Sequence, residues 1–344
     1  MTVLLLVMII SILVIISVGY FLSGPSYRGP VSDHFDGKKF FTPDGDRAKG
    51  LMELFKWLRT RKQEPWIELK EVVYGTKPPA RIGRGAYITF INHSTFLIQV
   101  DGINILTDPV WGKRVSPFTW SGPKRKRPPG LLFDDLPKID IILLSHNHYD
   151  HLDLATMRKL HEKHRPMIIT TLGVGALLRS KNIPGATELD WWQKLSITES
   201  LEVKAVPAQH FSSRGMFDRD ATLWCGFVIT RAGGNIYFAG DSGYNESLFK
   251  NIGNQCAPID LAIIPIGAYK PQWFMSPIHC SPEEAVQIHI DVKSKQSIAS
   301  HFGTFALADD GKDEPYCELQ KALKTKNVPI NEFIKLEEGT GKEF

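Results

Sequence analysis

The sequence predicts an α/β domain with mixed sheets and outer helices, preceded by an N-terminal membrane-spanning helix. Two observations predict the domain: short β-like runs separated by turns begin near residue 85, and later strand-like runs alternate with helical patterns. An uncharged apolar run at residues 3–22 predicts the membrane helix. A chain of 344 residues without an internal repeat is long enough for one large domain or two ordinary ones.

The apolar run, VLLLVMIISILVIISVGYFL, would be about 30 Å long as a helix, enough for the hydrocarbon core of a bilayer. No Lys or Arg precedes it and no A-x-A-like site clearly follows it, which favours an uncleaved single-pass anchor; a signal peptide is the alternative. The nearest basic residues, Arg28, Lys38 and Lys39, follow the run. The positive-inside rule therefore predicts a cytosolic body behind a membrane anchor.

The remaining elements follow from local patterns. Residues 23–45 are rich in Gly, Pro and Asp and predict an irregular segment, and AKGLMELFKWLRT (48–60) has apolar residues at helical spacing. The runs AYITFIN, TFLIQV and INILTD predict strands, with an Asp-Gly hairpin turn between the last two. LATMRKLHEKH and PEEAVQIHIDV predict helices between later strands.

The composition excludes several classes of protein. With 43% hydrophobic and 23% charged residues, the chain is not disordered. A net charge of +4 does not by itself imply nucleic-acid binding, and we expect no nucleic-acid partner. The four cysteines are far apart and form no CxxC pair, so neither a disulfide framework nor a zinc knuckle is expected.

Seven residues with metal-binding side chains follow predicted strands: His146, His148, Asp150, His151, His210, Asp241 and His301. Loops at strand ends converge on one edge of an α/β fold, so we expect these side chains to meet. Nitrogen ligands with carboxylates suit zinc or a similar first-row ion, and seven donors suffice for two ions if one carboxylate bridges. Asp241 is the expected bridge. His161, His164 and His289 are interpreted as ordinary histidines.

Other side chains are expected near these ions. Asp150, Asp241 and His279 are the predicted catalytic residues, although a loop histidine without a chemical role is the alternative for His279. His93 and Asp108 are expected to support the metal-binding loops rather than to bind metal.

Three side chains are predicted to contact substrate, with packing as the alternative for each: Tyr149, Trp273 and Phe274. The run GPKRKRPP, residues 122–129, holds four basic residues. It is interpreted as a solvated loop or, in an anchored protein, as a segment attracted to anionic lipid headgroups.

Several of these motifs together resemble a known family. The stretches are LTDPVW, GPKRKR, LLSHNHYDHLD, ELDWW, FAGDSGY, IPIGAYKPQWFM, PEEAVQIH and HFGTFALA, over roughly residues 81–337. They resemble the metallo-β-lactamase superfamily and, more closely, its N-acyl-phosphatidylethanolamine-hydrolysing phospholipase D branch. The resemblance implies an αβ/βα sandwich with a two-metal site between its sheets. The chain then divides into an anchor (1–24), an N-terminal extension (25–80) and a metallo-β-lactamase-like hydrolase domain (81–344).

The resemblance also implies ligands and an activity. His146, His148 and His210 would bind one zinc, and Asp150, His151 and His301 the other, with Asp241 bridging. A metal-bridging hydroxide would cleave N-acyl-phosphatidylethanolamine into N-acylethanolamine and phosphatidic acid. A membrane phospholipid is then the expected substrate and the bilayer the expected partner, and a homodimer is left open.

Two alternatives to this activity remain. One is another hydrolase on the same fold, such as a sugar-phosphate lactonase or another phosphodiesterase. The other is a non-catalytic metal-binding membrane protein, whose signature would be a missing ligand. All seven ligand positions are filled in this chain.

Overall fold

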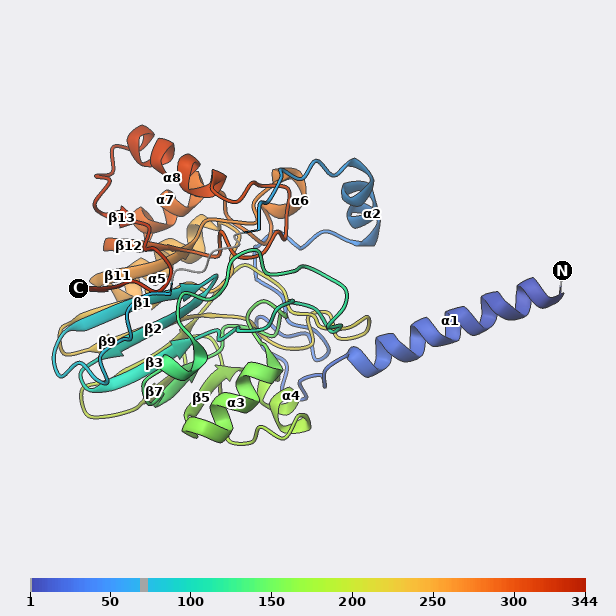
Figure 1. Cartoon of the computed structure of the whole chain (residues 1–344), viewed down its shortest axis with the longest axis horizontal. Helices are drawn as coiled ribbons and strands as arrows, with labels where there is room; N and C mark the ends of the chain where they lie inside the picture. The colour runs from blue at the N-terminus through green and yellow to red at the C-terminus, as the bar shows by residue number, and fades with distance from the viewer. Residues whose placement is uncertain (1, 69–73) are drawn as a thin grey trace.

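The computed structural model describes residues 2–68 and 74–344. Two seven-stranded sheets pack face to face in it, with helices on both outer faces (Figure 1). The first sheet has the order β14 (Gly341–Glu343), β1 (Ala86–Asn92), β2 (Thr95–Val100), β3 (Ile103–Thr107), β4 (Ile141–Leu143), β5 (Met167–Thr171), β6 (Ala186–Leu189). The second has the order β13 (Phe333–Ile334), β12 (Ser294–Ser300), β11 (Ile259–Pro265), β10 (Gly234–Phe238), β9 (Gly226–Arg231), β8 (Glu202–Val206), β7 (Lys194–Ser196). This is the predicted αβ/βα sandwich.

Helices bury the outer face of each sheet. Against the first sheet lie α3 (Leu154–His164) and α4 (Val174–Ser180), and against the second lie α5 (Glu246–Cys256), α7 (Pro282–Asp291) and α8 (Glu314–Thr325). Between the sheets, Phe90 of β1 stacks on Phe302, which follows β12, with ring centroids 5.8 Å apart. Both faces of each sheet are therefore buried, and the sandwich is a rigid scaffold for the loops at its edges.

Local sequence signals placed several of these elements correctly. β1, β2 and β3 occupy the predicted runs, and α3 spans the predicted helix. The hairpin between β2 and β3 turns at Asp101 and Gly102, both with positive φ, as the predicted Asp-Gly turn requires. The helix predicted around residues 48–60 begins at Leu51 as α2 (Leu51–Thr60), after the N-cap Gly50.

The strand directions bring the loops of interest to one edge. β3 and β4 are parallel, and β1 has the same direction because two antiparallel pairings separate it from β3. In the second sheet β10, β11 and β12 are parallel, and β8 again shares their direction through β9. The carboxyl ends of all these strands therefore lie at the same edge of their sheet, where α/β folds form sites.

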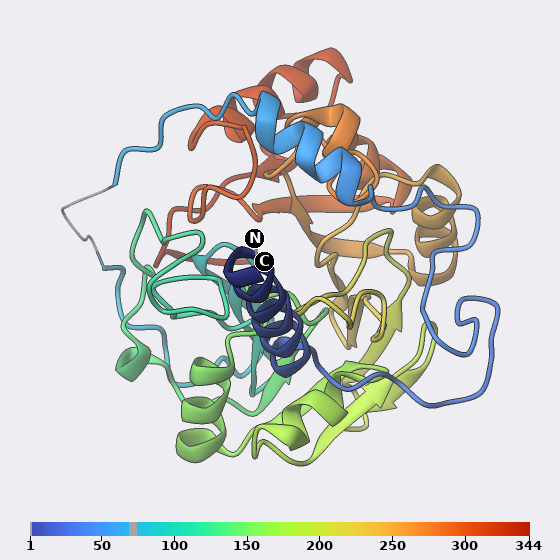
Figure 2. The ribbon, with the colours of Figure 1, turned by 90° about the vertical axis from the view of Figure 1, so that its right-hand side faces the viewer.

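Helix α1 (Thr2–Leu22) projects away from the sandwich (Figure 1). By length and composition its segment Leu4–Leu22 could cross a membrane, and almost none of that segment is buried against the body. Figure 2 looks onto the face from which α1 projects and shows α2 above it on the same side.

The predicted irregular segment after α1 contains no helix and packs against the sandwich. His34 Nε2 lies 2.7 Å from Asp190 Oδ1, and the His34 ring stacks on Trp191 with centroids 4.4 Å apart. Burial lowers the pKa of His34, but hydrogen bonds to Asp190 and Asp33 outweigh burial, so its pKa lies above the ordinary value of 6.5.

We expect the contribution of His34 to stability to depend on pH. Its pKa is higher in the folded than in the unfolded chain, so the contribution is full below pH 6.5 and is lost as the pH rises through the folded pKa. Thermal unfolding of wild type and His34→Phe, which keeps an aromatic ring for stacking, should differ most below pH 6.5 and less above it. An equal difference at every pH would contradict this assignment.

Candidate metal centre

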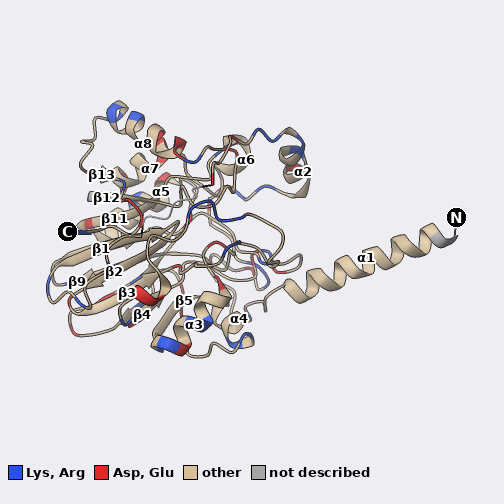
Figure 3. Cartoon of the chain, in the orientation of Figure 1, with Lys and Arg blue, Asp and Glu red and all other residues tan. Residues whose placement is uncertain are grey.

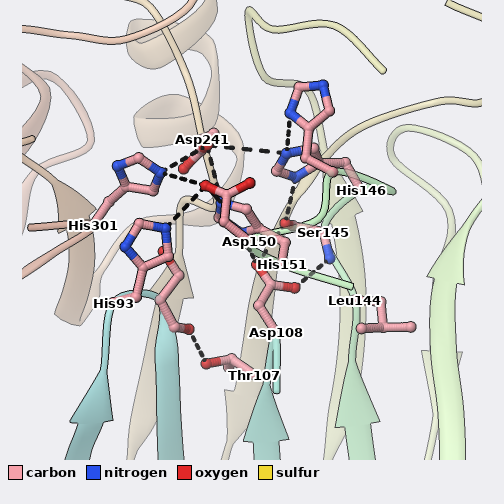
Figure 4. Close-up of polar contacts among 12 residues, drawn as sticks. His93, Thr107, Asp108, Leu144, Ser145, His146, Asp150, His151, Asp241 and His301 are labelled. Carbon is pink, nitrogen blue, oxygen red and sulfur yellow. Dashed lines mark hydrogen bonds and ion pairs between the residues drawn. The ribbon is translucent and has the colours of Figure 1, made fainter. Parts of the chain in front are cut away.

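The structure brings all seven predicted ligand residues together at the shared edge of the two sheets. Each follows a strand: His146, His148, Asp150 and His151 follow β4, and His210, Asp241 and His301 follow β8, β10 and β12. Figure 4 shows the two aspartates above the strand ends with imidazoles on either side. Both sheets therefore contribute to one cluster.

Three imidazoles form the first group. His148 Nδ1 lies 2.9 Å from His146 Nε2 and 3.2 Å from His210 Nε2. The three nitrogens all lie within 4.8 Å of one another. This is a suitable set of nitrogen ligands for a first-row metal ion.

A second group surrounds Asp150. Its Oδ2 lies 3.5 Å from His151 Nε2, 3.3 Å from His301 Nε2 and 3.0 Å from His93 Nε2. His93 lies in the turn between β1 and β2, and its backbone carbonyl accepts a hydrogen bond from His301 N. His93 is therefore grouped with Asp150, His151 and His301 as a candidate ligand, and its supporting rather than ligating role stays a prediction.

Asp241 lies between the two groups. Its Oδ2 is 3.0 Å from His151 Nε2 and 3.1 Å from His301 Nε2. The same oxygen is 3.7 Å from His210 Nε2 and 3.9 Å from His146 Nε2. A carboxylate in this position can reach both groups, as a bridging ligand must.

The protonation of the cluster follows from its burial and its carboxylates. Burial lowers the pKa of His148 to about 4 and of His210 to about 3, so these imidazoles are neutral and free to bind metal. Burial also lowers the pKa of His301, but Asp241 and Asp150 raise it to about 9. The pKa of both carboxyls is held well below its ordinary value by His151 and His301 despite burial.

Asp108 and Ser145 orient the ligands from below. Asp108 Oδ2 accepts hydrogen bonds from Ser145 Oγ at 2.6 Å and His151 Nδ1 at 2.7 Å, and Ser145 Oγ lies 2.9 Å from His146 Nδ1. His210 Nδ1 donates to the Ile278 carbonyl at 2.8 Å. Such contacts fix each ring so that its other nitrogen faces the metal. Gly240 lets Ser145 approach, because a Cβ at its positive φ would lie 2.8 Å from Ser145 Cβ.

Unpartnered buried atoms test whether the cluster fits metal ions. Within residues 2–68 and 74–344, no hydrogen-bond partner is found for Asp241 Oδ1 or His279 Nδ1, although both atoms are buried. Unpaired buried polar atoms are costly, and a metal ion would satisfy such atoms. The donor set, its convergence and these atoms fit a dinuclear metal centre.

A cavity of about 330 Å³ opens onto the cluster. His148, Asp150, Asp241 and the predicted catalytic His279 line its floor, and His279 Nδ1 lies 4.0 Å from Asp241 Oδ2. Its walls are mainly apolar: Leu51, Leu54, Trp57, Phe211, Phe274, Met275, Ile278 and Leu307. Sequence reasoning missed the part of this wall that α2 provides.

The three predicted substrate contacts have different positions. Phe274, on α6 (Gln272–Met275), lines the cavity and stacks on Trp57 with centroids 5.0 Å apart. Trp273 is not among the lining residues; it is partly exposed beneath Lys56. Tyr149 also lies outside the lining, because its hydroxyl donates to the Arg214 carbonyl at 3.1 Å and its ring carries the Arg214 guanidinium. Packing explains Tyr149, and its substrate role stays a prediction.

We predict that Asp108→Ala weakens metal binding about 10–100-fold, because it releases His151 and Ser145 from their fixed orientations. The measurement is competition of the purified protein with a chromophoric zinc chelator. Asp134→Ala, at an exposed carboxylate paired with Lys163, is the matched control and should bind metal like wild type. Equal metal affinity in Asp108→Ala and wild type would contradict the supporting role of Asp108.

Comparisons with known proteins agree with this geometry. A model of the "Beta-lactamase superfamily domain" matches residues 103–302. The "N-acyl-phosphatidylethanolamine-hydrolyzing phospholipase D 1" of Caenorhabditis elegans is 36% identical over 308 residues, which cover 84% of this chain and 85% of the worm protein.

Solved structures share the fold at low sequence identity. A metallo hydrolase of Ignicoccus hospitalis superposes with a TM-score of 0.58 at 20% identity, over 75% of this chain and 98% of the other. CmlA, a diiron β-hydroxylase of Streptomyces venezuelae, gives 0.55 at 20% identity, over 76% and 55%. The fold, the clustered ligands and the family match lead to one conclusion: the chain belongs to the metallo-β-lactamase superfamily of metal-dependent hydrolases.

Proposed function

We propose that the protein is a membrane-anchored, zinc-dependent phospholipase D that cleaves N-acyl-phosphatidylethanolamine into N-acylethanolamine and phosphatidic acid. The observation that carries this proposal is the apolar cavity of about 330 Å³ whose floor is the cluster of metal-ligand residues. The likeness to the worm phospholipase, which extends over most of both chains, supports the same substrate class.

Hydrolysis of a phosphodiester needs a nucleophile, stabilisation of the negative charge on the phosphoryl oxygens and a leaving group. A pair of divalent ions, when bound, lowers the pKa of water and draws charge from phosphoryl oxygens. His146, His148 and His210 would hold one ion and Asp150, His151 and His301 the other, with Asp241 shared. Water adds its oxygen to phosphorus, the bond from phosphorus to the ethanolamine oxygen breaks, and that oxygen takes up a proton.

His279 is placed to contact the group that leaves. It lines the cavity beside Asp241, and burial lowers its pKa to about 3, so the ring is neutral. A neutral imidazole can donate one hydrogen bond to a phosphoryl or leaving oxygen. We assign His279 to this contact.

The cavity wall suits an acyl chain and its rim suits an anion. Leu54, Trp57 and Phe274 present apolar surface above the metal-ligand residues. Lys49 and Arg219 add positive charge to the same lining. A lipid with a phosphodiester between two apolar parts matches this division.

The outer surface of α2 favours a substrate delivered from a bilayer. Met52, Phe55 and Leu58 are exposed on it, while Leu51 and Trp57 line the cavity. α2 lies on the side from which α1 projects (Figure 2). An amphipathic helix with exposed apolar residues binds at a membrane interface, so the mouth of the cavity would face the membrane that α1 spans. The positive-inside rule places the body in the cytosol.

Product analysis tests the reaction. Detergent-solubilised protein with N-acyl-phosphatidylethanolamine should release phosphatidic acid and N-acylethanolamine, read by mass spectrometry. Chelator treatment and Asp241→Asn should each abolish release, since both remove metal from between the two ligand groups. Adding zinc, iron or manganese back to the chelator-treated protein shows which metal restores product release. This comparison is needed because the ligand set accepts each of the three metals. If metal binds and neither product appears, the phospholipase assignment is wrong and another hydrolase of this fold remains.

Filling the cavity should impair lipid substrates selectively. Leu54→Trp places a larger ring in the cavity, so kcat/KM for N-acyl-phosphatidylethanolamine should fall at least about tenfold. Hydrolysis of bis(p-nitrophenyl) phosphate, which has no acyl chain, should change much less. Leu132→Trp, the same change at an exposed leucine outside the cavity lining, is the matched control and should retain both activities. Equal loss on both substrates in Leu54→Trp would contradict an acyl-chain role for this cavity.

A further inference from the structure

A second cavity lies where α1 meets the body, outside the metal centre. It has a volume of about 380 Å³ and is lined by the end of α1, the loop around Lys113 to Thr119, the start of α3 and the end of α4. Phe21 and Leu22 of α1 provide apolar surface, and Ser116 and Thr119 provide hydroxyls. Nothing in the proposed reaction uses this cavity.

The charge of its lining is strongly one-sided. Four basic side chains and one acidic side chain line it: Lys113, Arg114, Lys181, Arg214 and Asp153. The Asp153 carboxylate is occupied, since it accepts hydrogen bonds from Gly112 N at 2.8 Å, Thr156 Oγ1 at 2.6 Å and Ala155 N at 3.0 Å. Across the described residues, Lys113, Arg114 and Lys181 form no ion pair. Arg114 and Arg214 also donate to backbone carbonyls, which leave their positive charge uncompensated, so the lining favours an anion.

The end of α1 is held firmly against this site. Gly24 N donates to Asp218 Oδ2 at 2.6 Å, and Phe217 N donates to Ser23 Oγ at 3.0 Å. Gly19 packs directly on Met216, whose Cβ would lie 2.9 Å from a Cβ at that glycine. The cavity is therefore a fixed feature of the junction between helix and body.

Exposed aromatic residues near this cavity indicate its position relative to the membrane–water boundary. Tyr20 is 71% and Phe21 79% exposed at the end of α1, and Trp120 is 75% exposed beside Phe118, with ring centroids 5.2 Å apart. Tyr and Trp concentrate at the membrane–water boundary of spanning helices. Figure 3 shows no charged residue in the described part of α1, whereas the body beyond its end contains segments of Lys, Arg, Asp and Glu. The cavity thus lies at the level of lipid headgroups.

We propose that this cavity binds the phosphate group of an anionic phospholipid whose acyl chains extend along α1. The basic side chains and hydroxyls would hold the phosphate, and Phe21 and Leu22 would contact the first part of the chains. The proposal rests on the membrane anchor of the proposed function but not on the reaction.

The cavity also shares a wall with the metal-binding loop. Arg214 Nη1 donates to the carbonyls of Asn147 at 2.7 Å and Leu152 at 2.9 Å, and Arg214 stacks on Tyr149. A change in the cavity can therefore alter activity indirectly. Lipid binding, rather than turnover, is the appropriate readout.

Native mass spectrometry of the full chain, with phosphatidylglycerol and phosphatidylcholine as probes in the absence of substrate, tests the proposal. Wild type should retain phosphatidylglycerol preferentially. The triple variant Lys113→Gln, Arg114→Gln, Lys181→Gln should lose about fivefold in affinity for each basic residue removed. A control with the same loss of charge, Lys324→Gln, Lys342→Gln, Arg165→Gln, lies on exposed sites away from α1 and should keep the preference (Figure 1).

Three outcomes would overturn the proposal. The first is equal retention of phosphatidylglycerol by the triple variant and the control, and the second is the absence of a lipid preference in wild type. The third is displacement of the lipid by inorganic phosphate at the same concentration, because free phosphate would then be the ligand. Unchanged melting temperature of the triple variant shows that it is folded, and Lys113→Glu with Lys181→Glu provides a second variant at exposed positions. If the protein does not catalyse the phospholipase reaction, lipid retention should still be observed. If alkaline carbonate extracts the wild-type protein from membranes, the membrane anchor is disproved.

Discussion

The balance of buried charge at the shared edge of the two sheets is the constraint on which the rest of the structure depends. Asp150 and Asp241 are surrounded by imidazoles from both sheets, and a buried carboxylate is tolerated only with such partners or a metal. Neither sheet alone supplies the set. The backbone carries strain here as well, because His93, Asp108 and His301 all have positive φ. A rigid sandwich behind the loops is what holds these conformations.

The same edge lies on the side of the molecule from which α1 projects (Figure 2). α2 covers the metal-ligand residues with one surface and exposes apolar side chains with the other. Hydrogen bonds to the body hold α2 in place: Trp57 Nε1 donates to Asp309 Oδ2 at 3.1 Å, and Arg61 Nε donates to Asp309 Oδ1 at 3.0 Å. α1 is fixed separately through Asp218. α1 and α2 are thus both attached to loops that adjoin the same metal-ligand residues.

How much could be predicted from sequence depended on whether the signal was local. His146 to His151 are close in the chain and the strands before the other ligands are plain apolar runs, so the cluster and the sandwich were predicted correctly. The substrate role of Tyr149 stays a prediction, since its hydroxyl donates to the Arg214 carbonyl and it is not among the residues that line the cavity over the metal-ligand residues. The cavity wall was missed because α2 contacts Asp309 across 252 positions of sequence. Apolar residues on both sides of α2 were the available signal.

The most direct test of the account is the fate of the water oxygen. Hydrolysis of N-acyl-phosphatidylethanolamine in heavy-oxygen water, followed by mass spectrometry of both products, reports which atom is attacked. Attack at phosphorus, which the arrangement of metal-ligand residues beneath the cavity predicts, places the label in phosphatidic acid and leaves N-acylethanolamine unlabelled. Label in N-acylethanolamine or in a released fatty acid would mean that carbon is attacked and would contradict the account.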